Sequence, residues 1–323
     1  MRKGVNPEKF KNELLPVFTH RVVVPVYIPN LEDAYYRNQF EVFEKFLKHL
    51  IASVNPLRTA ITLIDNNCCS EISDFIDINR FTIDKIVRFN ENKGKVFPVL
   101  QEARAAAEPF ITITDADVLF FKGWEEGVFN IFTKCPKAGV VAPLPSAGLA
   151  FYCNTAVFID NFFKGKIQYG KFISDQDSEM YLYGMGNKAL LDRRNRKYSW
   201  KERQYYLSDS DAIIGCGHFV ATYRSDIFKN STGFPKLKFK NGLEEDFIDI
   251  LSDKKGYYRL STRETYAYHM GNTLVNDQIQ EVFKVDYKLS SSFLNASFTS
   301  SHSSIPFIIR KYLFSLIIKI FKL

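Results

Sequence analysis

The sequence predicts an α/β fold with a mainly parallel central sheet and flanking helices. Runs of β-forming residues alternate with segments of helical spacing, and polar residues directly follow several of these runs. Strands that alternate with helices form parallel sheets through right-handed crossovers. Because such sheets bind ligands beyond the carboxyl ends of their strands, we expect the functional residues to gather at one edge of the sheet.

Four strands are expected in the N-terminal part of the chain, each a short apolar run closed by polar or turn residues. They cover residues 21–28, 59–64, 85–89 and 110–114. Apolar residues near one face predict a helix over 33–54, and strong helix formers predict another over 96–107. Two further strands are expected at 139–143 and 212–221.

The composition indicates a globular protein with a mild basic excess. Of the 323 residues, 46% are hydrophobic, which supports a real core and excludes global disorder. The net charge of +7 suits anionic partners, but no zinc-finger, RNP or basic-zipper pattern points to nucleic acid. Five cysteines with no Cys-x-x-Cys pattern describe no disulfide framework, so a reducing compartment is expected. Neither a signal peptide nor a membrane-spanning stretch is expected.

Two aspartates, Asp115 and Asp117, directly follow the run Phe110–Thr114. Carboxylates one residue apart at the end of a buried strand offer hard oxygen ligands, which suit Mg²⁺ or Mn²⁺ together with a substrate diphosphate. The alternative is an ordinary strand-end turn, in which aspartate is common. Tyr27 and Asp65 also come just after expected strands, so the topology predicts one shared site for these residues.

A second acidic cluster contains Glu244, Glu245, Asp246 and Asp249. Interleaved apolar residues predict a helix that begins here, and the helix dipole favours carboxylates at such a position. The alternative is catalytic, because a carboxylate near a bound substrate can take the proton of an incoming hydroxyl as a general base.

His269 and the glycines Gly215 and Gly217 complete the set of candidate residues. A histidine after the segment Thr265–Tyr268 is either structural or a further metal ligand. The two glycines precede an apolar run and allow either a close approach of backbone to ligand or a turn or bulge.

Together these segments resemble the family 2 glycosyltransferases of the GT-A fold, over roughly residues 20–272. The matching segments, in chain order, are Val22–Tyr27, Leu63–Asn66, Asn92–Lys95, Thr114–Asp117, Gly215–Gly217, Glu244–Asp246 with Gly256 downstream, and His269. The resemblance implies a GT-A-type fold and an inverting, metal-dependent enzyme that moves a sugar from a nucleotide sugar to an acceptor hydroxyl.

The resemblance also implies how the sugar donor is bound. Tyr27 and Asp65 would bind the nucleoside, by stacking and by hydrogen bonding to the base. Lys95, or Lys93 in its place, would lie near the nucleotide. Asp115 would contact the ribose or the metal shell.

The remaining implied roles concern the metal and the reaction. Asp117 would coordinate Mn²⁺ or Mg²⁺, and His269 would complete the metal site or touch the diphosphate. Asp246 would be the catalytic base with Glu245 as its neighbour or stand-in. Gly215 and Gly217 would lie on the acceptor side.

Several departures from the family pattern limit these expectations. The family often has two aspartates after the second strand, whereas this chain has Asp65 followed by Asn66, and Asn66–Cys69 replaces a usual Gly-Ser turn. The nucleobase is therefore not assigned. No Gln-x-x-Arg-Trp-type motif follows Asp246 and no set of membrane helices is evident, which indicates a non-processive enzyme.

The expected organisation is a catalytic domain followed by a linker and a C-terminal helix. Residues 1–288 form the domain, with a nucleotide-sugar half at about 20–120 and an acceptor half at about 121–288. The serine-rich segment 289–305 is expected as a linker and 306–323 as a helix.

This helix is expected to be amphipathic and basic. Lys311, Ser315, Lys319 and Lys322 gather on one arc, and apolar residues cover most of the remainder. Such a helix fits the surface of an anionic membrane, and the alternative is docking on the domain's own core. The basic stretch 188–203 is either a solvated surface or a lip over an anionic substrate or membrane.

The expected function is therefore sugar transfer at the cytoplasmic face of the membrane, to a glycan or lipid-linked acceptor in surface polysaccharide synthesis. A sugar-nucleotide pyrophosphorylase is one alternative, although the segment Tyr27–Asn30 lacks the glycine-rich phosphate loop of such enzymes. A non-catalytic protein that binds glycan or acts as a scaffold is another, and retention of Asp115, Asp117, Asp246 and His269 argues against it.

Overall fold

A computed structural model describes residues 4, 18–184, 199–229, 231, 233–274 and 298–323. The strands are β1 (His20–Val26), β2 (Thr59–Asp65), β3 (Lys85–Arg88), β4 (Phe110–Thr114), β5 (Val118–Phe120), β6 (Ala138–Ala142), β7 (Ile167–Gly170), β8 (Gln204–Leu207), β9 (Ala212–Ile214), β10 (Val220–Arg224), β11 (Tyr258–Ser261) and β12 (Ala267–His269). The helices are α1 (Gln39–Ser53), α2 (Ser70–Ile78), α3 (Val96–Ala105), α4 (Trp124–Lys134), α5 (Thr155–Asn161), α6 (Asp175–Gly184), α7 (Asp226–Lys229), α8 (Ile250–Lys255) and α10 (Phe307–Phe321), and Glu245–Asp249 form a π-helical turn.

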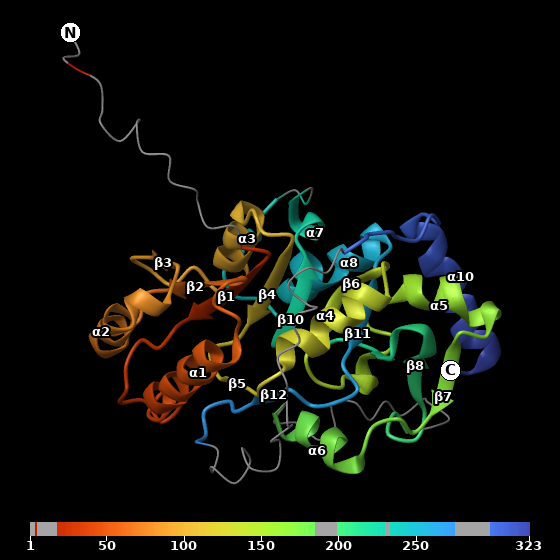
Figure 1. Cartoon of the computed structure of the whole chain (residues 1–323), viewed down its shortest axis with the longest axis horizontal. Helices are drawn as coiled ribbons and strands as arrows, with labels where there is room; N and C mark the ends of the chain where they lie inside the picture. The colour runs from red at the N-terminus through yellow and green to blue at the C-terminus, as the bar shows by residue number, and fades with distance from the viewer. Residues whose placement is uncertain (1–3, 5–17, 185–198, 230, 232, 275–297) are drawn as a thin grey trace.

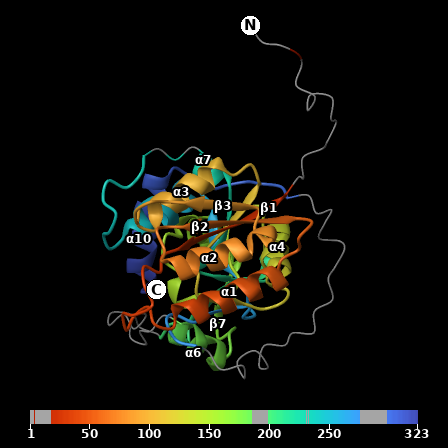
Figure 2. The same cartoon turned by 90° about the vertical axis from the view of Figure 1, so that its left-hand side faces the viewer.

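The predicted α/β class is confirmed, and the central sheet is partly parallel. Ten strands follow the order β3-β2-β1-β4-β10-β6-β11-β9-β8-β7, with helices on both faces (Figure 1). Figure 2 shows α3 and α7 above the sheet and α1 and α2 below it. The pairs among β3, β2, β1 and β4 are parallel, as is β6 with β11. The other pairs are antiparallel; β8 and β9 are joined by four residues, too short a connection for the crossover that a parallel pair needs.

The register of the parallel strands brings their polar ends to one edge. Val26 pairs with Asp65 across β1 and β2, and Val23 pairs with Ile113 across β1 and β4. Tyr27, Asn66 and Asp115, which follow these strands, therefore leave the sheet at the same edge. This is the edge at which the sequence predicts the site.

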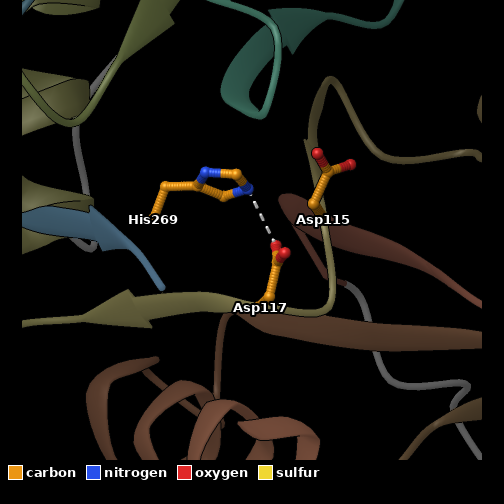
Figure 3. Close-up of side chains that lie close together, drawn as sticks. All are labelled: Asp115, Asp117 and His269. Carbon is orange, nitrogen blue, oxygen red and sulfur yellow. Dashed lines mark ion pairs between the residues drawn. The ribbon is translucent and has the colours of Figure 1, made fainter. Parts of the chain in front are cut away.

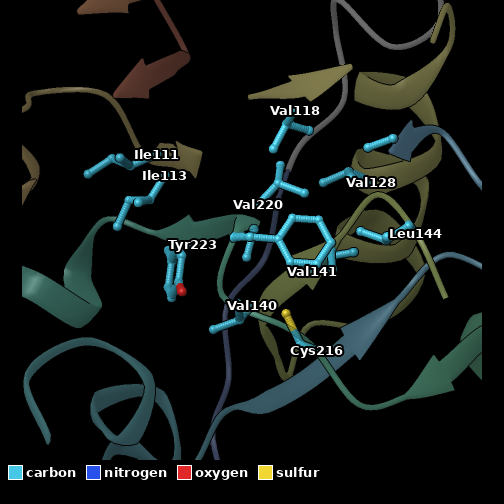
Figure 4. Close-up of a cluster of buried hydrophobic side chains, with 14 of the residues drawn as sticks. Ile111, Ile113, Val118, Val128, Val140, Val141, Leu144, Cys216, Val220 and Tyr223 are labelled. Carbon is cyan, nitrogen blue, oxygen red and sulfur yellow. The ribbon is translucent and has the colours of Figure 1, made fainter. Parts of the chain in front are cut away.

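Buried aliphatic and aromatic side chains from neighbouring strands form the core (Figure 4). Ile111 and Ile113 of β4 lie beside Val220 and Tyr223 of β10, and all four are nearly inaccessible to solvent. Because helices cover both faces of the sheet, every residue of β4 and β10 is buried, including the polar residues Thr112 and Thr222. That burial fixes the carboxyl ends of the strands in place.

A fully buried polar network also stabilises the core and was not expected from the sequence. The Glu125 carboxylate of α4 accepts hydrogen bonds from Thr59 Oγ1 (2.5 Å) and from the Asn55 backbone N–H (2.7 Å), and contacts His20 Nδ1 at 2.9 Å. On its other side, His20 Nε2 lies 2.7 Å from Thr112 Oγ1. The network ties α4 to β1, β2 and β4.

The C-terminal helix α10 packs on the domain through one face. Phe314 is buried with its ring 5.3 Å from that of Phe158 in α5, and Arg310 donates to the carbonyl of Asp253 at the end of α8. Just before the helix, Ser303 Oγ donates to Asp160 at 2.7 Å. The predicted linker is thus held against the domain over 298–305, and its first part, 289–297, lies outside the described residues. Most of the basic stretch 188–203 also lies outside them. None of the helices in the described part of the chain has the length and apolar character that crossing a bilayer requires.

Replacing Glu125 with alanine is expected to lower the free energy of unfolding by about 3 kcal/mol or more. The reason is that several buried groups lose their partner, at about 1–3 kcal/mol each. Urea denaturation of the folded variant measures this loss. The matched control is Glu126→Ala, the same change one residue later at a partly exposed position, which is expected to cost less than about 1 kcal/mol. Equal losses in the two variants would contradict the structural role of the network.

Candidate active site

His269 is far from Asp115 and Asp117 in the sequence, and the three residues come together beyond the end of β4. The short strand β12 pairs antiparallel with β5, so His269 lies opposite Val118. The Met270 N–H donates to the Asp117 carbonyl at 2.8 Å, and the Asp115 N–H donates to the Phe219 carbonyl at 2.8 Å. Backbone hydrogen bonds therefore hold both segments in place without using the side chains.

The three side chains form a group with the geometry of a cation site (Figure 3). His269 Nε2 faces Asp117 Oδ1 at 3.2 Å, and one potential ligand atom from each residue lies within 4.8 Å of the other two. Asp117 Oδ1 is buried and accepts no hydrogen bond from the described residues. A buried carboxylate oxygen is costly unless it is well compensated, and a divalent ion shared with His269 and Asp115 would add to the compensation that the nearby His269 ring offers. The residues present therefore fit Mn²⁺ or Mg²⁺.

Lys95, at the start of α3, lies between the candidate metal ligands and the acidic cluster. Its ammonium group forms ion pairs with Asp115 and with Glu244 Oε1, the latter at 2.6 Å. Burial alone lowers the pKa of Lys95, but the two carboxylates outweigh burial and hold this pKa above its ordinary value. Lys95 is thus a permanent positive charge beside Asp115. The alternative lysine, Lys93, is paired with Glu91 instead.

A cavity of about 340 Å³ opens beside these charges. Its volume lies in the range of small-molecule sites. Tyr27 lines it, and the Tyr36 ring meets the Tyr27 ring edge to face with centroids 6.3 Å apart. The other lining residues include both aspartates and the residues of two loops: Ile28, Tyr35, Gln39, Asn66, Asn92, Gly94, Lys95, Asp115, Asp117 and Phe239. The cavity combines an aromatic wall, amide groups and a charged rim.

The expected nucleoside-binding residue Asp65 lies behind this wall. It is buried, and its carboxylate accepts hydrogen bonds from the Cys68 N–H (2.9 Å) and from Ser73 Oγ (2.7 Å) at the start of α2. Asn66 lines the cavity in its place. This difference follows from the turn after β2, which commits the Asp65 carboxylate to the adjoining helix.

Asn66 also fixes the loop that carries Lys95. Its Oδ1 accepts from the Lys93 N–H at 2.9 Å, and its Nδ2 donates to the Gly94 carbonyl at 3.1 Å. Gly94 has a φ of +75°, and a Cβ there would lie 2.3 Å from the Lys238 carbonyl oxygen. The glycine of the Asn92–Lys95 motif is therefore required by backbone packing.

The acidic cluster divides between two places. Glu244 faces the first cavity through its ion pair with Lys95, whereas Asp246 lines a separate cavity of about 400 Å³ together with Arg104, Lys254 and Lys255. Glu245 is exposed. The π-helical turn over Glu245–Asp249 contains an extra residue relative to an α-helical turn, so side-chain positions deduced from α-helical spacing do not apply here. The structure thus does not bring Asp246 together with Asp115 and Asp117, and it brings Glu244 there.

A buried ion pair supports the other flank of Glu244. Asp249 and Arg259 are fully buried and bonded through Oδ1 and Nη2 at 2.9 Å. His218 Nδ1 lies 3.4 Å from Asp249 Oδ2, and His218 Nε2 lies 3.8 Å from Glu244 Oε2. Burial raises the pKa of Asp249, but Arg259 and His218 outweigh burial and hold this pKa well below its ordinary value. Burial lowers the pKa of His218, whereas Asp249 and Glu244 raise it, so the net pKa lies above the ordinary value.

Gly215 and Gly217 shape the loop between β9 and β10 and position His218. The sequence had predicted a single strand over 212–221, which this loop interrupts. Gly215 has a φ of +133°, and a Cβ there would lie 2.3 Å from the Ser146 carbonyl oxygen. The Gly217 N–H donates to Ser146 Oγ at 3.3 Å. Close backbone packing is therefore the reason for Gly215, and the loop brings His218 to the rim of the site.

Sequence reasoning missed Tyr36, Asn92, His218 and Arg259 as parts of the site. Tyr36 lies within 33–54, which was predicted as a helix, and Asn92 was given only as the first residue of the matching segment Asn92–Lys95. His218 stands beside a glycine pair that was singled out, which is the one signal that could have found it. Arg259 lies in the buried strand β11, where nothing in the local pattern reveals its partner Asp249.

No family model and no curated protein sequence matches the chain. Solved structures do resemble it. Staphylococcus aureus TarS 1–349 matches with a TM-score of 0.46 and 12% identity, covering 78% of this chain and 60% of that one. The same TarS fragment in complex with UDP-GlcNAc matches with a TM-score of 0.44 and 14% identity, covering 88% and 74%.

A third similar structure is the mannosyltransferase PcManGT from Pyrobaculum calidifontis in complex with GDP-Man and Mn²⁺. It has a TM-score of 0.41 and 12% identity, covering 76% of this chain and 55% of that one. Two of these structures thus contain nucleotide sugars, UDP-GlcNAc and GDP-Man. TM-scores below 0.5 at identities this low carry no argument about this chain, so its function has to be argued from its own residues.

Replacing Asp117 with asparagine is expected to weaken Mn²⁺ binding by more than about 10-fold, which is the cost of even an outer-shell change at a metal site. Free Mn²⁺ measured by electron paramagnetic resonance during a titration reports the affinity. Asp209→Asn, at an exposed aspartate paired with Lys166, is the matched control and is expected to bind like the parent protein. Equal affinities for the two variants would remove Asp117 from the metal site.

Proposed function

We propose that this protein is a nucleotide-sugar-dependent glycosyltransferase with a GT-A-type fold. The observation that carries the proposal is the convergence of Asp115, Asp117 and His269 at the rim of the cavity lined by Tyr27. A nucleoside diphosphate offers an aromatic base at one end and two phosphates at the other. The lining of the cavity contains aromatic side chains as well as a lysine and candidate metal ligands.

The sugar donor is proposed to bind with its base against Tyr27 and Tyr36 and its diphosphate beside Lys95. In this role Asn66 replaces Asp65, because the Asp65 carboxylate is already bonded to Cys68 and Ser73. Asp117 and His269 would hold a divalent ion, with Asp115 in the metal shell or at the ribose. Such an ion supplies positive charge to the departing diphosphate.

Transfer is proposed to invert the anomeric carbon, by in-line attack of an acceptor hydroxyl. Lys95 stays protonated because its pKa is raised, so it offers a fixed charge where negative charge grows on the leaving group. Binding of an anionic diphosphate gives Lys95 a competing partner, and its contact with Glu244 would weaken as a result. That exchange would leave the Glu244 carboxylate available to the acceptor.

Glu244 is accordingly proposed as the catalytic base in place of Asp246, with Glu245 as its exposed neighbour. The support is positional: Glu244 contacts Lys95, which contacts Asp115, whereas Asp246 lines the second cavity. His218, fixed by Asp249, flanks Glu244 and would hold its carboxylate in place. Asp249 itself is unsuited to proton transfer from an acceptor, since it is fully buried and ion-paired.

The acceptor is proposed to be a glycan or a lipid-linked sugar used in surface polysaccharide synthesis, with the protein peripheral on the inner face of the membrane. The acceptor would approach past the Gly215–Gly217 loop. Support for this part is chemical, because the net charge of +7 favours phosphate-bearing partners.

A Mn²⁺-dependent affinity for nucleoside diphosphates tests the proposed class. Isothermal titration calorimetry with UDP and GDP, with and without Mn²⁺, is expected to give binding that needs the ion for at least one nucleotide. Lys95→Ala is expected to weaken that binding because it removes the charge beside Asp115, and Lys93→Ala is the matched control. Absence of Mn²⁺-dependent binding for all common nucleoside diphosphates would contradict the proposal.

The catalytic base is tested by comparing two neutral variants of the acidic cluster. Glu244→Gln is expected to lower the transfer rate by about 10²–10⁴-fold, the usual contribution of a positioned base, while nucleotide-sugar binding persists. Asp246→Asn is expected to keep most of the activity. The assay is release of nucleoside diphosphate in the presence of acceptor, with binding followed by calorimetry. The reverse ranking would return the role to Asp246.

A further inference from the structure

The helix α10 has a second face that the domain leaves uncovered. Its docked face consists of the buried residues Arg310, Phe314 and Ile317. At 3.6 residues per turn, the opposite side carries large apolar side chains that remain exposed, among them Tyr312 at 66% and Ile320 at 68% of their accessible surface. The exposed apolar residues of the helix are Ile308, Ile309, Tyr312, Leu313, Leu316, Ile320 and Phe321.

A neighbouring turn extends this apolar surface. Phe162–Lys164 form a short 3₁₀ helix after α5, and Phe163 is 75% exposed. The Phe321 ring lies 4.9 Å from Phe162 and 6.2 Å from Phe163, measured between centroids. The uncovered side of α10 and Phe163 thus form one continuous surface, called here the outer face. Figure 1 shows α10 at the edge of the molecule, beyond α5.

One side of the outer face is lined by positive charge. Lys311, Lys319 and Lys322 are exposed and lie along one arc of the helix, beside the exposed apolar residues. The stretch 298–323 contains no aspartate or glutamate. An apolar surface flanked by lysines matches the boundary between lipid headgroups and acyl chains in an anionic leaflet.

We infer that the outer face of α10 docks on an anionic lipid surface, as a rigid attachment built into the domain. The helix lies flat, with Tyr312, Leu316 and Ile320 between the acyl chains and the lysines at the headgroups. Docking of Arg310 and Phe314 on α8 and α5 fixes the whole domain relative to the lipid. The inference is independent of the proposed catalytic function, because α10 packs on α5 and α8 and none of its residues lines the nucleotide cavity.

The charge pattern favours lipid over a second copy of the chain. In a two-fold symmetric dimer the same surface meets itself. The lysines of one outer face would then approach those of its partner, with no acidic residue in 298–323 to neutralise them. An anionic membrane neutralises the same three lysines directly.

Vesicle flotation of the full chain tests the inference. The parent protein is expected to float with vesicles of phosphatidylcholine mixed with phosphatidylglycerol, and far less with phosphatidylcholine alone. Leu316→Glu combined with Ile320→Glu is expected to abolish flotation. The matched control, Leu57→Glu with Phe81→Glu, introduces the same charges at residues 82% and 90% exposed elsewhere on the domain and is expected to float like the parent.

The lysines are tested separately. Changing Lys311, Lys319 and Lys322 to glutamine is expected to weaken binding to the anionic vesicles roughly 100-fold and to remove most of its salt dependence, because each lysine near such a surface contributes roughly a fivefold gain. The control variant carries three lysine-to-glutamine changes at exposed positions outside α10, namely Lys122, Lys229 and Lys236. Its net charge equals that of the α10 variant. This control is expected to bind nearly as the parent does.

Three outcomes would overturn the inference. The parent protein could fail to float with either vesicle, or the Leu316/Ile320 variant could float as well as its control. Alternatively, light scattering could show a dimer of the parent that the same two substitutions convert to a monomer, which would make the outer face an interface between copies. Unchanged thermal unfolding and unchanged nucleotide binding of the variants keep a failure here distinct from a failure of the proposed transferase function.

Discussion

The antiparallel pairing of β5 with β12 is the constraint on which the candidate site depends. It sets His269 opposite Val118 and lets the Met270 N–H bond to the Asp117 carbonyl. Without it, Asp115 and Asp117 would be two carboxylates in a strand-end turn, a common arrangement without chemistry. Because the pairing uses backbone atoms, it positions the three candidate ligands without using their side-chain ligand atoms.

A chain of alternating charges connects this site to the interior. It runs through Arg259, Asp249, His218, Glu244, Lys95 and Asp115. Each charge is compensated by its neighbours, so neutralising one alters the environment of the next. This coupling links the side on which an acceptor would approach to the side on which a diphosphate would bind. Arg259 and Asp249 need this compensation most, since unpaired buried charges are strongly destabilising.

The sequence predicted the strands well where apolar runs were long and buried. The strand 110–114 is confirmed to the residue, and the parallel arrangement of β1, β2, β3 and β4 is confirmed as part of a mixed sheet. Convergence of Asp115, Asp117 and His269 was predictable from a resemblance and not from local pattern. The position of Asp246 was not predictable, because a π-helical turn leaves no mark in hydrophobic spacing. The Asp249–Arg259 pair depends on tertiary contacts that neither segment reveals alone.

Anomalous X-ray diffraction from crystals grown with Mn²⁺ and a nucleoside diphosphate would test the central claim most directly. The account predicts a manganese peak coordinated by Asp117 and His269, with Asp115 beside it and the diphosphate between the ion and Lys95. A peak elsewhere on the protein, or a nucleotide bound outside the cavity lined by Tyr27, would contradict the account.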